Sequence, residues 1–332
     1  MFRKKPYRIN TYLSYGTLQH FRAQGRALEY QGVNFEGNTN VWQTLKNIYK
    51  QFESDEIRNT ALEIKLSNGT SFETTTDKEG YFKIDEVLQE PYLLTDQDDW
   101  LPYTVSFKNT TDHKIIDHNI FKGKMLLPER NASYGIISDI DDTILHTGVA
   151  SVFKWRLVAN TFFKNFDRRM PLEGTSEFYK KLHSGKKGDV LNPIFYVSNS
   201  PWNLHDYLAA FLSKNQFPEG PILLRDFRNP FEAKPKKQLP HKEAEISTIL
   251  ESYPELKFIL IGDSGEKDAD IYIKTAKKFP GRILAIYVRN VNHLKRDSRI
   301  TELLDTFNEI PTLLVKTSQQ AEEHAKKHGF IS

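Results

Sequence analysis

Acidic and hydroxyl side chains cluster in three short segments, each of which directly follows an apolar run. These segments are Ser138-Asp139-Ile140-Asp141-Asp142-Thr143, Ser198-Asn199-Ser200-Pro201-Trp202 and Gly262-Asp263-Ser264-Gly265-Glu266-Lys267-Asp268. A basic stretch, Lys234 to Lys242, precedes the last of them. Carboxylates can bind a divalent cation, transfer a proton or attack a phosphoryl group. Because the sequence has no cysteine, any metal would have to bind oxygen or histidine.

Apolar strands alternating with amphipathic helices are expected to position these segments. The predicted strands are Tyr134 to Ser138, Ile194 to Val197, Ile222 to Leu224, Phe258 to Ile261, Ile283 to Val288 and Thr312 to Val315. The predicted helices include Ser176 to Leu182, Leu204 to Leu212, Glu243 to Ser252, Asp268 to Phe279 and Gln319 to His328. Continuously apolar strands in this alternation indicate an α/β fold with a parallel sheet covered on both faces. The polar segments would then gather at the carboxyl ends of the strands.

The first part of the chain has a different pattern, of short alternating runs broken by turn residues. Ala61 to Leu66, the turn Ser67 to Thr70 and Ser71 to Thr74 predict one hairpin, and residues 76–84 predict a second through Asp77 and Gly80. A helix is expected around residues 41–52, where apolar residues recur at helical spacing. We therefore predict a small all-β sandwich over residues 1–127 and an α/β domain over residues 128–332.

The composition is that of an ordinary soluble protein, with 39% apolar and 27% charged residues in a chain of 332. The net charge of +3 is too small to indicate a nucleic-acid partner. The basic start of the chain lacks the apolar segment of a secretory signal, and no apolar run reaches spanning length. We therefore expect a cytoplasmic protein whose membrane contact, where there is any, is peripheral.

These motifs resemble those of the haloacid dehalogenase superfamily, which are Asp-x-Asp-x-Thr, a Ser or Thr, a Lys, and Gly-Asp-x-x-x-x-Asp. All four occur here in order. Residues 123–290 further resemble the catalytic domain of the actin-patch phosphatidate phosphatases, relatives of the lipins. The motifs that carry this resemblance are Ser138 to Ile144, Tyr196 to Leu204, Gly220 to Asp226 and Gly262 to Asp268. The resemblance implies a Rossmann-like sheet of the haloacid dehalogenase type, preceded by an accessory β-sandwich.

The resemblance also implies a role for each motif residue. Asp139 would be the nucleophile, and Asp141 would protonate the leaving oxygen and then activate water. Lys242 would neutralise charge on the nucleophile and the transferred group. A Mg²⁺ cofactor would be bound by Asp139, the backbone carbonyl of Asp141, and Asp263, with Asp268 in support. Substrate-binding positions would be Thr143, Ser198 and Asn199.

Taken singly, several of these residues have plainer interpretations. Ser198 could cap the following helix, and Asp268 could be the N-cap of the helix that runs to Phe279. Thr143 could serve only to stabilise its loop. Spacing alone does not choose between Lys242 and Lys234, Lys236 and Lys237 as the motif lysine.

The stretch between Asp139 and Ser198 has room for one extra helix and a flap, rather than for a full cap domain. We therefore expect an open site that favours a large or interface-bound substrate. Residues 151–169 hold five basic residues, one acidic residue and five large aromatics. This segment could lie in a lipid interface with its cations near anionic head groups, or its aromatics could pack against the sandwich domain.

The expected function is Mg²⁺-dependent hydrolysis of a phosphomonoester, and the resemblance implies phosphatidic acid as the substrate and diacylglycerol as the product. One alternative is the same chemistry on another large phosphate, such as a phosphoprotein or a nucleic-acid end. The other is a module that binds phosphatidic acid without hydrolysing it. The presence of both Asp139 and Asp141 argues against the binding module.

Overall fold

The computed structural model describes residues 5–30, 55–89, 99–108, 114–144, 173–188, 190–225, 239–291 and 294–332. The chain forms two compact units, Met1–Leu127 and Pro128–Ser332. The helix expected around residues 41–52 and the segment 151–169 lie outside the described residues. Within the described part of the chain, no helix is long and apolar enough to cross a membrane.

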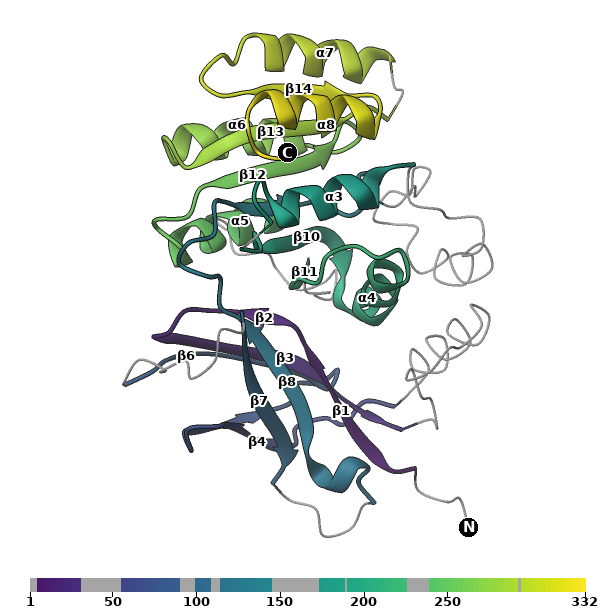
Figure 1. Ribbon diagram of the computed structural model, residues 1–332. Helices are drawn as coiled ribbons and strands as arrows, with labels where there is room; N and C mark the ends of the chain where they lie inside the picture. The colour runs from purple at the N-terminus through teal and green to yellow at the C-terminus, as the bar shows by residue number, and fades with distance from the viewer. Residues whose placement is uncertain are drawn as a thin grey trace. The chain divides into compact units, whose positions relative to one another are not determined.

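The first unit contains two β-sheets that share one core (Figure 1). The antiparallel order β1-β3-β6 is formed by Tyr7–Tyr12, His20–Glu29 and Tyr81–Val87. The order β2-β8-β7-β4-β5 is formed by Ser14–Tyr15, Phe121–Leu126, Trp100–Phe107, Ala61–Leu66 and Ser71–Thr75. A short 3-10 turn, Asp117–Asn119, precedes β8. Phe21 and Phe82 from one sheet meet Ile64 and Tyr103 from the other in the core.

Of the two predicted hairpins, the first is confirmed and the second is wrong. β4 and β5 pair antiparallel across the turn at residues 67–70. The turn at residues 76–80 is present, since Asp77 Oδ1 accepts hydrogen bonds from the backbone N–H of Glu79 and Tyr81, both at 2.8 Å. However, the strand that follows it is β6, which pairs with β3 in the other sheet. Turn residues reverse the chain locally, but they do not specify the strand with which β6 pairs, which here lies more than 50 residues away in sequence.

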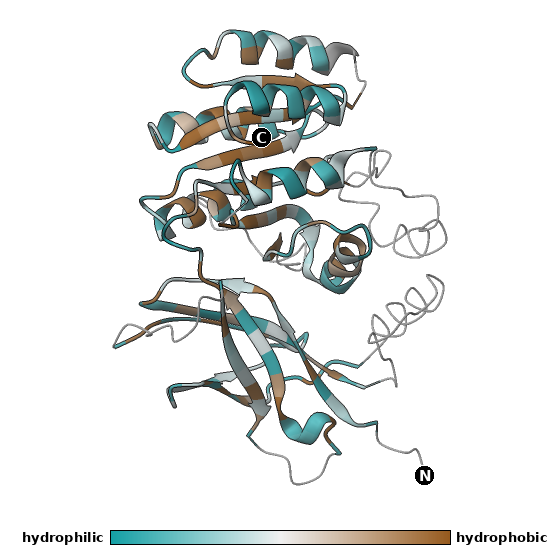
Figure 2. Cartoon of the chain, viewed as in Figure 1, coloured by the Kyte–Doolittle hydropathy of each residue, from teal (hydrophilic) through white to brown (hydrophobic). Residues whose placement is uncertain are grey.

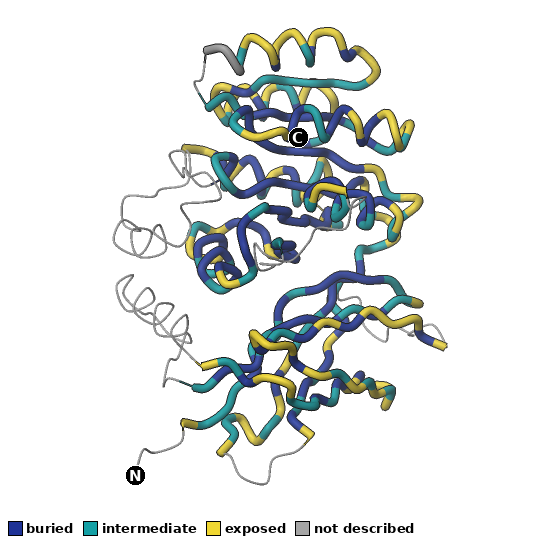
Figure 3. Tube along the Cα trace, turned by 180° about the vertical axis from the view of Figure 1, so that it is seen from behind, coloured by how far each residue is buried: buried dark blue, intermediate teal, exposed yellow. Residues whose placement is uncertain are grey.

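The second unit is built on a six-stranded parallel sheet, as predicted. Its order is β11-β10-β9-β12-β13-β14, formed by Ile222–Arg225, Ile194–Pro201, Gly135–Ser138, Phe258–Asp263, Ile283–Arg289 and Thr312–Val315. The central strands are hydrophobic (Figure 2) and buried along almost their whole length (Figure 3). They therefore lack the polar-apolar alternation seen in β4.

Helices cover both faces of this sheet (Figure 1). α3 (Thr175–Ser184) contacts α8 (Ser318–Lys327) on one face, and α5 (His241–Ser252) contacts α6 (Asp268–Lys278) on the other. α4 (His205–Lys214), reached through a 3-10 turn at Trp202–Leu204, contacts β11, and α7 (Leu294–Asp305) contacts β14. α7 was absent from the predicted ranges because it is largely polar, and Ile300 and Leu304 are buried within it.

The strand order places a topological switch point at the centre of the sheet. From β9 the chain moves outward through β10 to β11, and from β12 it moves in the opposite direction through β13 to β14. β9 and β12 are hydrogen-bonded neighbours, so their carboxyl ends open the crevice where ligands bind in folds of this kind.

Candidate active site

Two aspartates stand at the switch point, one at the end of each central strand. Asp263 is the last residue of β12, and Asp139 directly follows β9. The backbone N–H of Asp139 donates to the carbonyl of Ile261 at 2.9 Å, which extends the pairing of the two strands by one residue. Both side chains are therefore held by the most buried part of the sheet.

Lys242, in the first turn of α5, lies at the centre of the cluster. Its Nζ is 2.8 Å from Asp139 Oδ1, 2.8 Å from Glu266 Oε2 and 2.7 Å from Asp268 Oδ1. Only 2% of its side chain is exposed. The other three candidate lysines lie outside the described residues, so among the described ones Lys242 is the lysine that joins these carboxylates.

The carboxylates differ in how many of their oxygens accept hydrogen bonds. Asp268 accepts from Lys242 on Oδ1 and from the backbone N–H of Asp263 on Oδ2. Asp268 is the first residue of α6, and its side chain turns into this cluster instead of capping the helix. Asp139 Oδ2 accepts from the Thr143 hydroxyl at 3.0 Å, and Asp263 Oδ1 accepts from the backbone N–H groups of Gly265 and Glu266.

Within this site, three buried carboxylate oxygens accept no hydrogen bond from the described residues: Asp139 Oδ1, whose contact with Lys242 Nζ is an ion pair, Asp141 Oδ1 and Asp263 Oδ2. A buried carboxylate oxygen without such a partner is costly unless it binds a cation. Asp139, Asp263 and Asp268 each place one oxygen within 4.8 Å of the others. A hard divalent cation bound by oxygen fits this arrangement, and Asp139 and Asp263 contribute the free oxygens.

Burial and mutual repulsion dominate the electrostatics of the cluster. Burial raises the pKa of Asp139 well above its usual value, against the pull of Lys242, and Asp268, Asp263 and Asp141 raise it further. Burial alone would lower the pKa of Lys242, but the surrounding carboxylates, Asp139 first, raise it well above its usual value. One ammonium therefore cannot hold all of these carboxylates ionised.

Asp141 points to a separate pair of hydroxyl groups. Its Oδ2 accepts hydrogen bonds from Ser198 Oγ at 2.6 Å and from Ser200 Oγ at 2.9 Å. Burial raises the pKa of Asp141, while these two hydrogen bonds oppose the shift. Ser198 does not cap a helix, because its hydroxyl lies between Asp141 and the backbone N–H of Ser200. Asn199 turns the other way and donates from Nδ2 to Glu266 Oε2 at 2.9 Å.

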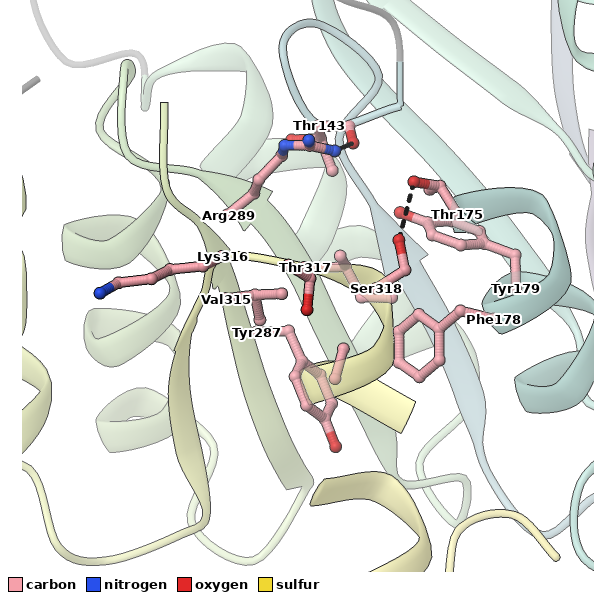
Figure 4. A pocket seen from close by; sticks show the side chains of 12 residues that line it. Thr143, Thr175, Phe178, Tyr179, Tyr287, Arg289, Val315, Lys316, Thr317 and Ser318 are labelled. Atoms are coloured by element: carbon pink, nitrogen blue, oxygen red, sulfur yellow. Dashed lines mark hydrogen bonds between the residues drawn. The ribbon is translucent and has the colours of Figure 1, made fainter. Parts of the chain in front are cut away.

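A small pocket lies beside the loop that follows β9 and is lined by Thr143 of that loop and by residues of α3, β12, β13, β14 and α8 (Figure 4). Its volume is about 40 Å³. Arg289, at the end of β13, reaches across it and donates from Nη1 to the carbonyl of Thr143 at 3.3 Å. On the opposite wall, the hydroxyls of Thr175 and Ser318 lie 3.2 Å apart. Arg289 thus links the strand beside Asp263 to the loop that carries Asp139.

Ser200, Glu266 and Arg289 also belong to the site, although none of them was predicted as a site residue. Ser200 and Glu266 lie inside motifs that were recognised, two residues after Ser198 and three after Asp263, so their position was an available signal. Arg289 ends an apolar strand next to Asp263, which is also where a functional residue is expected. Their partners, however, belong to segments that are remote in sequence.

In the absence of metal, the free energy of unfolding is expected to decrease as pH rises, because the contribution of Asp263 depends on pH. Burial and Asp268 raise the pKa of Asp263 from 3.8 to about 8. At a pH between these two pKa values, Asp263 takes up a proton when the protein folds. The stabilisation that results is complete below about pH 4 and is lost as pH rises through about 8. Urea unfolding of the chelator-treated protein at about pH 5 and about pH 8 measures the loss.

In Asp263→Asn this loss should be smaller, because the amide does not titrate. Mg²⁺ should also reduce the loss in the wild type, because a cation binds the ionised carboxylate. If the stability of Asp263→Asn and that of the wild type depended on pH equally, the pH-dependent stability could not be attributed to Asp263.

Comparison with known proteins identifies a family model for part of the second unit and relatives that match most of the chain. A sequence model described as "Phosphatidate phosphatase APP1, catalytic domain" matches residues 134–290. Phosphatidate phosphatase APP1 of Saccharomyces cerevisiae is 32% identical over 283 residues, which are 81% of this chain and 44% of that protein. An uncharacterised protein of Schizosaccharomyces pombe is 32% identical over 222 residues, which are 66% of this chain and 34% of that protein.

The chain thus spans less than half the length of these two relatives. Likeness to solved structures is weak. A carbohydrate acetylesterase from Xanthomonas citri is 9% identical, covers 97% of this chain and 75% of that one, and has a TM-score of 0.32, which is too low to indicate a shared fold.

Proposed function

Because residues 134–290 belong to the family of the phosphatidate phosphatase APP1 catalytic domain, we propose that this protein is a Mg²⁺-dependent phosphatase that hydrolyses phosphatidic acid to diacylglycerol and phosphate. The observation that carries the proposal is the buried cluster at the switch point, where Lys242 lies within 2.8 Å of Asp139 and the carboxylate of Asp268. We assign the parallel sheet to the haloacid dehalogenase type, and the first unit to an accessory domain.

In the first half of the reaction, a carboxylate oxygen of Asp139 forms a bond to phosphorus while the bond from phosphorus to the glycerol oxygen breaks. Asp141 gives its proton to that oxygen, so that diacylglycerol leaves as a neutral alcohol. Burial, first of all, raises the pKa of Asp141, which supports this role because the protonated fraction is larger than that of an exposed aspartate. An aspartyl phosphate remains on Asp139.

In the second half, Asp141 is a carboxylate and accepts a proton from water, whose oxygen attacks the same phosphorus atom. The bond between phosphorus and Asp139 breaks, phosphate is released, and both aspartates return to their starting states. Ser198 and Ser200 both donate to Asp141 Oδ2, so Ser200 can keep that side chain in place when the single O–H group of Ser198 turns to a phosphate oxygen.

A Mg²⁺ ion held by Asp139, the Asp141 carbonyl and Asp263, with Asp268 in support, would supply the positive charge that the crowded carboxylates and the phosphate require. This ligand set is supported by Asp139 Oδ1 and Asp263 Oδ2, which accept no hydrogen bond from the described residues. Lys242 contributes the one buried ammonium of the described cluster, and Thr143, Ser198 and Asn199 contribute donors for the phosphate oxygens.

Phosphate release from a panel of substrates, with and without Mg²⁺, tests this function. Phosphatidic acid in vesicles is expected to be hydrolysed faster than soluble sugar phosphates, and chelation should abolish the reaction. Faster turnover of a phosphopeptide or a nucleic-acid end would instead favour the same chemistry on another large phosphate. Binding of phosphatidic acid without any release would favour a non-catalytic module.

We also propose a cytoplasmic protein that contacts anionic membranes peripherally through residues 151–169. The support is compositional, since this segment carries five basic residues and five large aromatics. Phosphate release from dispersed and from vesicle-bound phosphatidic acid tests this proposal. If dispersed short-chain phosphatidic acid were hydrolysed as fast as the lipid in vesicles, a membrane-contacting segment would have no role in catalysis.

A further inference from the structure

One oxygen atom, Glu266 Oε2, holds two of the residues that the proposed function assigns to the phosphate. It accepts a hydrogen bond from Lys242 Nζ at 2.8 Å and another from Asn199 Nδ2 at 2.9 Å. Asn199 lies in β10, Lys242 in the first turn of α5, and Glu266 in the turn between β12 and α6. A single carboxylate oxygen thus joins three segments of the site.

Three carboxylates surround the Lys242 ammonium while this contact is made. Its Nζ donates hydrogen bonds to Glu266 Oε2 and Asp268 Oδ1 and forms an ion pair with Asp139 Oδ1, at distances of 2.7–2.8 Å. A phosphate that approaches Lys242 is repelled by all three carboxylates, so it binds most favourably if one of them leaves.

Glu266 is the partner that can leave at the smallest cost. The side chains of Asp139 and Asp268 are 0% exposed, whereas that of Glu266 is 38% exposed. A carboxylate at the surface regains hydration when it turns outward, while a buried one would have to remain in the cluster without its partner. Its departure would free Lys242 and Asn199 together.

We infer that Glu266 is a placeholder, a carboxylate whose Oε2 occupies the position of a phosphate oxygen until the substrate displaces it. This inference rests on the proposed function, since it concerns how the phosphate reaches Lys242 and Asn199. A carboxylate oxygen resembles a phosphate oxygen in charge and in hydrogen bonding, so it can hold both donors in their working positions. It also keeps the buried ammonium paired when no substrate is bound.

The placeholder sets a threshold for ligands of this site. An incoming anion must offer Lys242 and Asn199 better hydrogen bonds than Glu266 does. A phosphate dianion, with more charge and more acceptor oxygens than a carboxylate, meets this requirement. Glu266 is therefore a specificity-determining residue that favours phosphate over singly charged anions.

The test is the affinity for inorganic phosphate, measured by titration calorimetry at a Mg²⁺ concentration that saturates each protein. Glu266→Gln keeps the size of the side chain and an acceptor for Asn199, but loses the charge-assisted contact with Lys242. Its dissociation constant for phosphate is expected to fall roughly tenfold, and KM should fall in parallel. Glu266→Ala should shift both in the same direction.

Asp270→Asn is a matched control. Asp270 lies four residues after Glu266, in the first turn of α6; its side chain is 42% exposed, and it pairs with Arg299 rather than with Lys242. The control removes the same charge but should leave phosphate affinity unchanged, so a tightening in both variants would be a general charge effect and would overturn the inference.

Unchanged or weaker phosphate binding in folded Glu266→Gln would also overturn it, because a residue that merely positions Lys242 should weaken binding when it is lost. Loss of folding in both Glu266 variants would do the same, since a displaceable carboxylate is not required for folding. Phosphate binding needs no turnover, so a wild type that hydrolyses nothing would refute the proposed function while leaving this measurement readable.

Discussion

Asp139→Asn is expected to lower phosphate release by about 10⁴-fold or more. An amide oxygen is a poor nucleophile and cannot form the aspartyl phosphate through which both halves of the reaction pass. The substitution is nearly isosteric, so the contact with the Thr143 hydroxyl can be kept. The side chain is fully buried directly after β9.

Steady-state phosphate release with phosphatidic acid as substrate measures the effect, and a thermal unfolding midpoint verifies that the variant folds. Asp142→Asn is the matched control, because it makes the same chemical change three residues along the same loop. Asp142 has a φ of 53°, a conformation that asparagine tolerates well, so this variant should fold and retain activity. A folded Asp139→Asn that retained more than about a hundredth of wild-type activity would exclude Asp139 as the nucleophile.

Lys242→Met is expected to have the largest effect on stability. Removing one member of a buried charge cluster typically costs about 3–5 kcal/mol, because the remaining charges are left without a counter-ion. Here the ammonium is 2% exposed and lies within 2.8 Å of three carboxylates. The variant should unfold at a lower urea concentration in the presence of a chelator, and Mg²⁺ should restore part of the loss by neutralising the same carboxylates.

Activity should fall as well, by about 10²–10³-fold even at saturating Mg²⁺, since the charge that stabilises the transferring group is lost. Lys274→Met provides the comparison for stability. Lys274 pairs with Glu243, but its side chain is 61% exposed, so its removal should cost less than about 1 kcal/mol. Equal destabilisation in the two lysine variants would mean that Lys242 does not balance the buried carboxylates.

Much of the second unit could be predicted from the sequence because its signals are local. The strands of the parallel sheet read as uninterrupted apolar runs, and α3, α4, α5, α6 and α8 begin and end within a few residues of their predicted bounds. Helix α7 was not among the predicted helices, because few apolar residues, such as the buried Ile300 and Leu304, mark its inner face. The second hairpin was wrong for a different reason, since the turn at Asp77 and Gly80 is local but the pairing of β6 with β3 is not.

Residue types and short spacing are enough to predict that carboxylates, serines and a lysine follow the strands of a parallel sheet in a set order. These features are encoded directly by neighbouring residues. Which side chains meet depends on the fold. Ser198 and Asp141 are 57 residues apart and Asn199 and Glu266 are 67 apart, so their contacts arise only when the sheet brings the strand ends together.

Lys242 also became identifiable only in the fold. Its spacing in the sequence did not distinguish it from the nearby lysines, but among the described residues it is the lysine that is buried between Asp139, Asp268 and Glu266. A charge inside a protein is stable only where counter-charges converge on it, and convergence is a property of the fold. For that reason the types of the reactive groups could be predicted from the sequence. The hydrogen bonds that Lys242 and Asn199 both donate to Glu266 Oε2 could be recognised only in the structure.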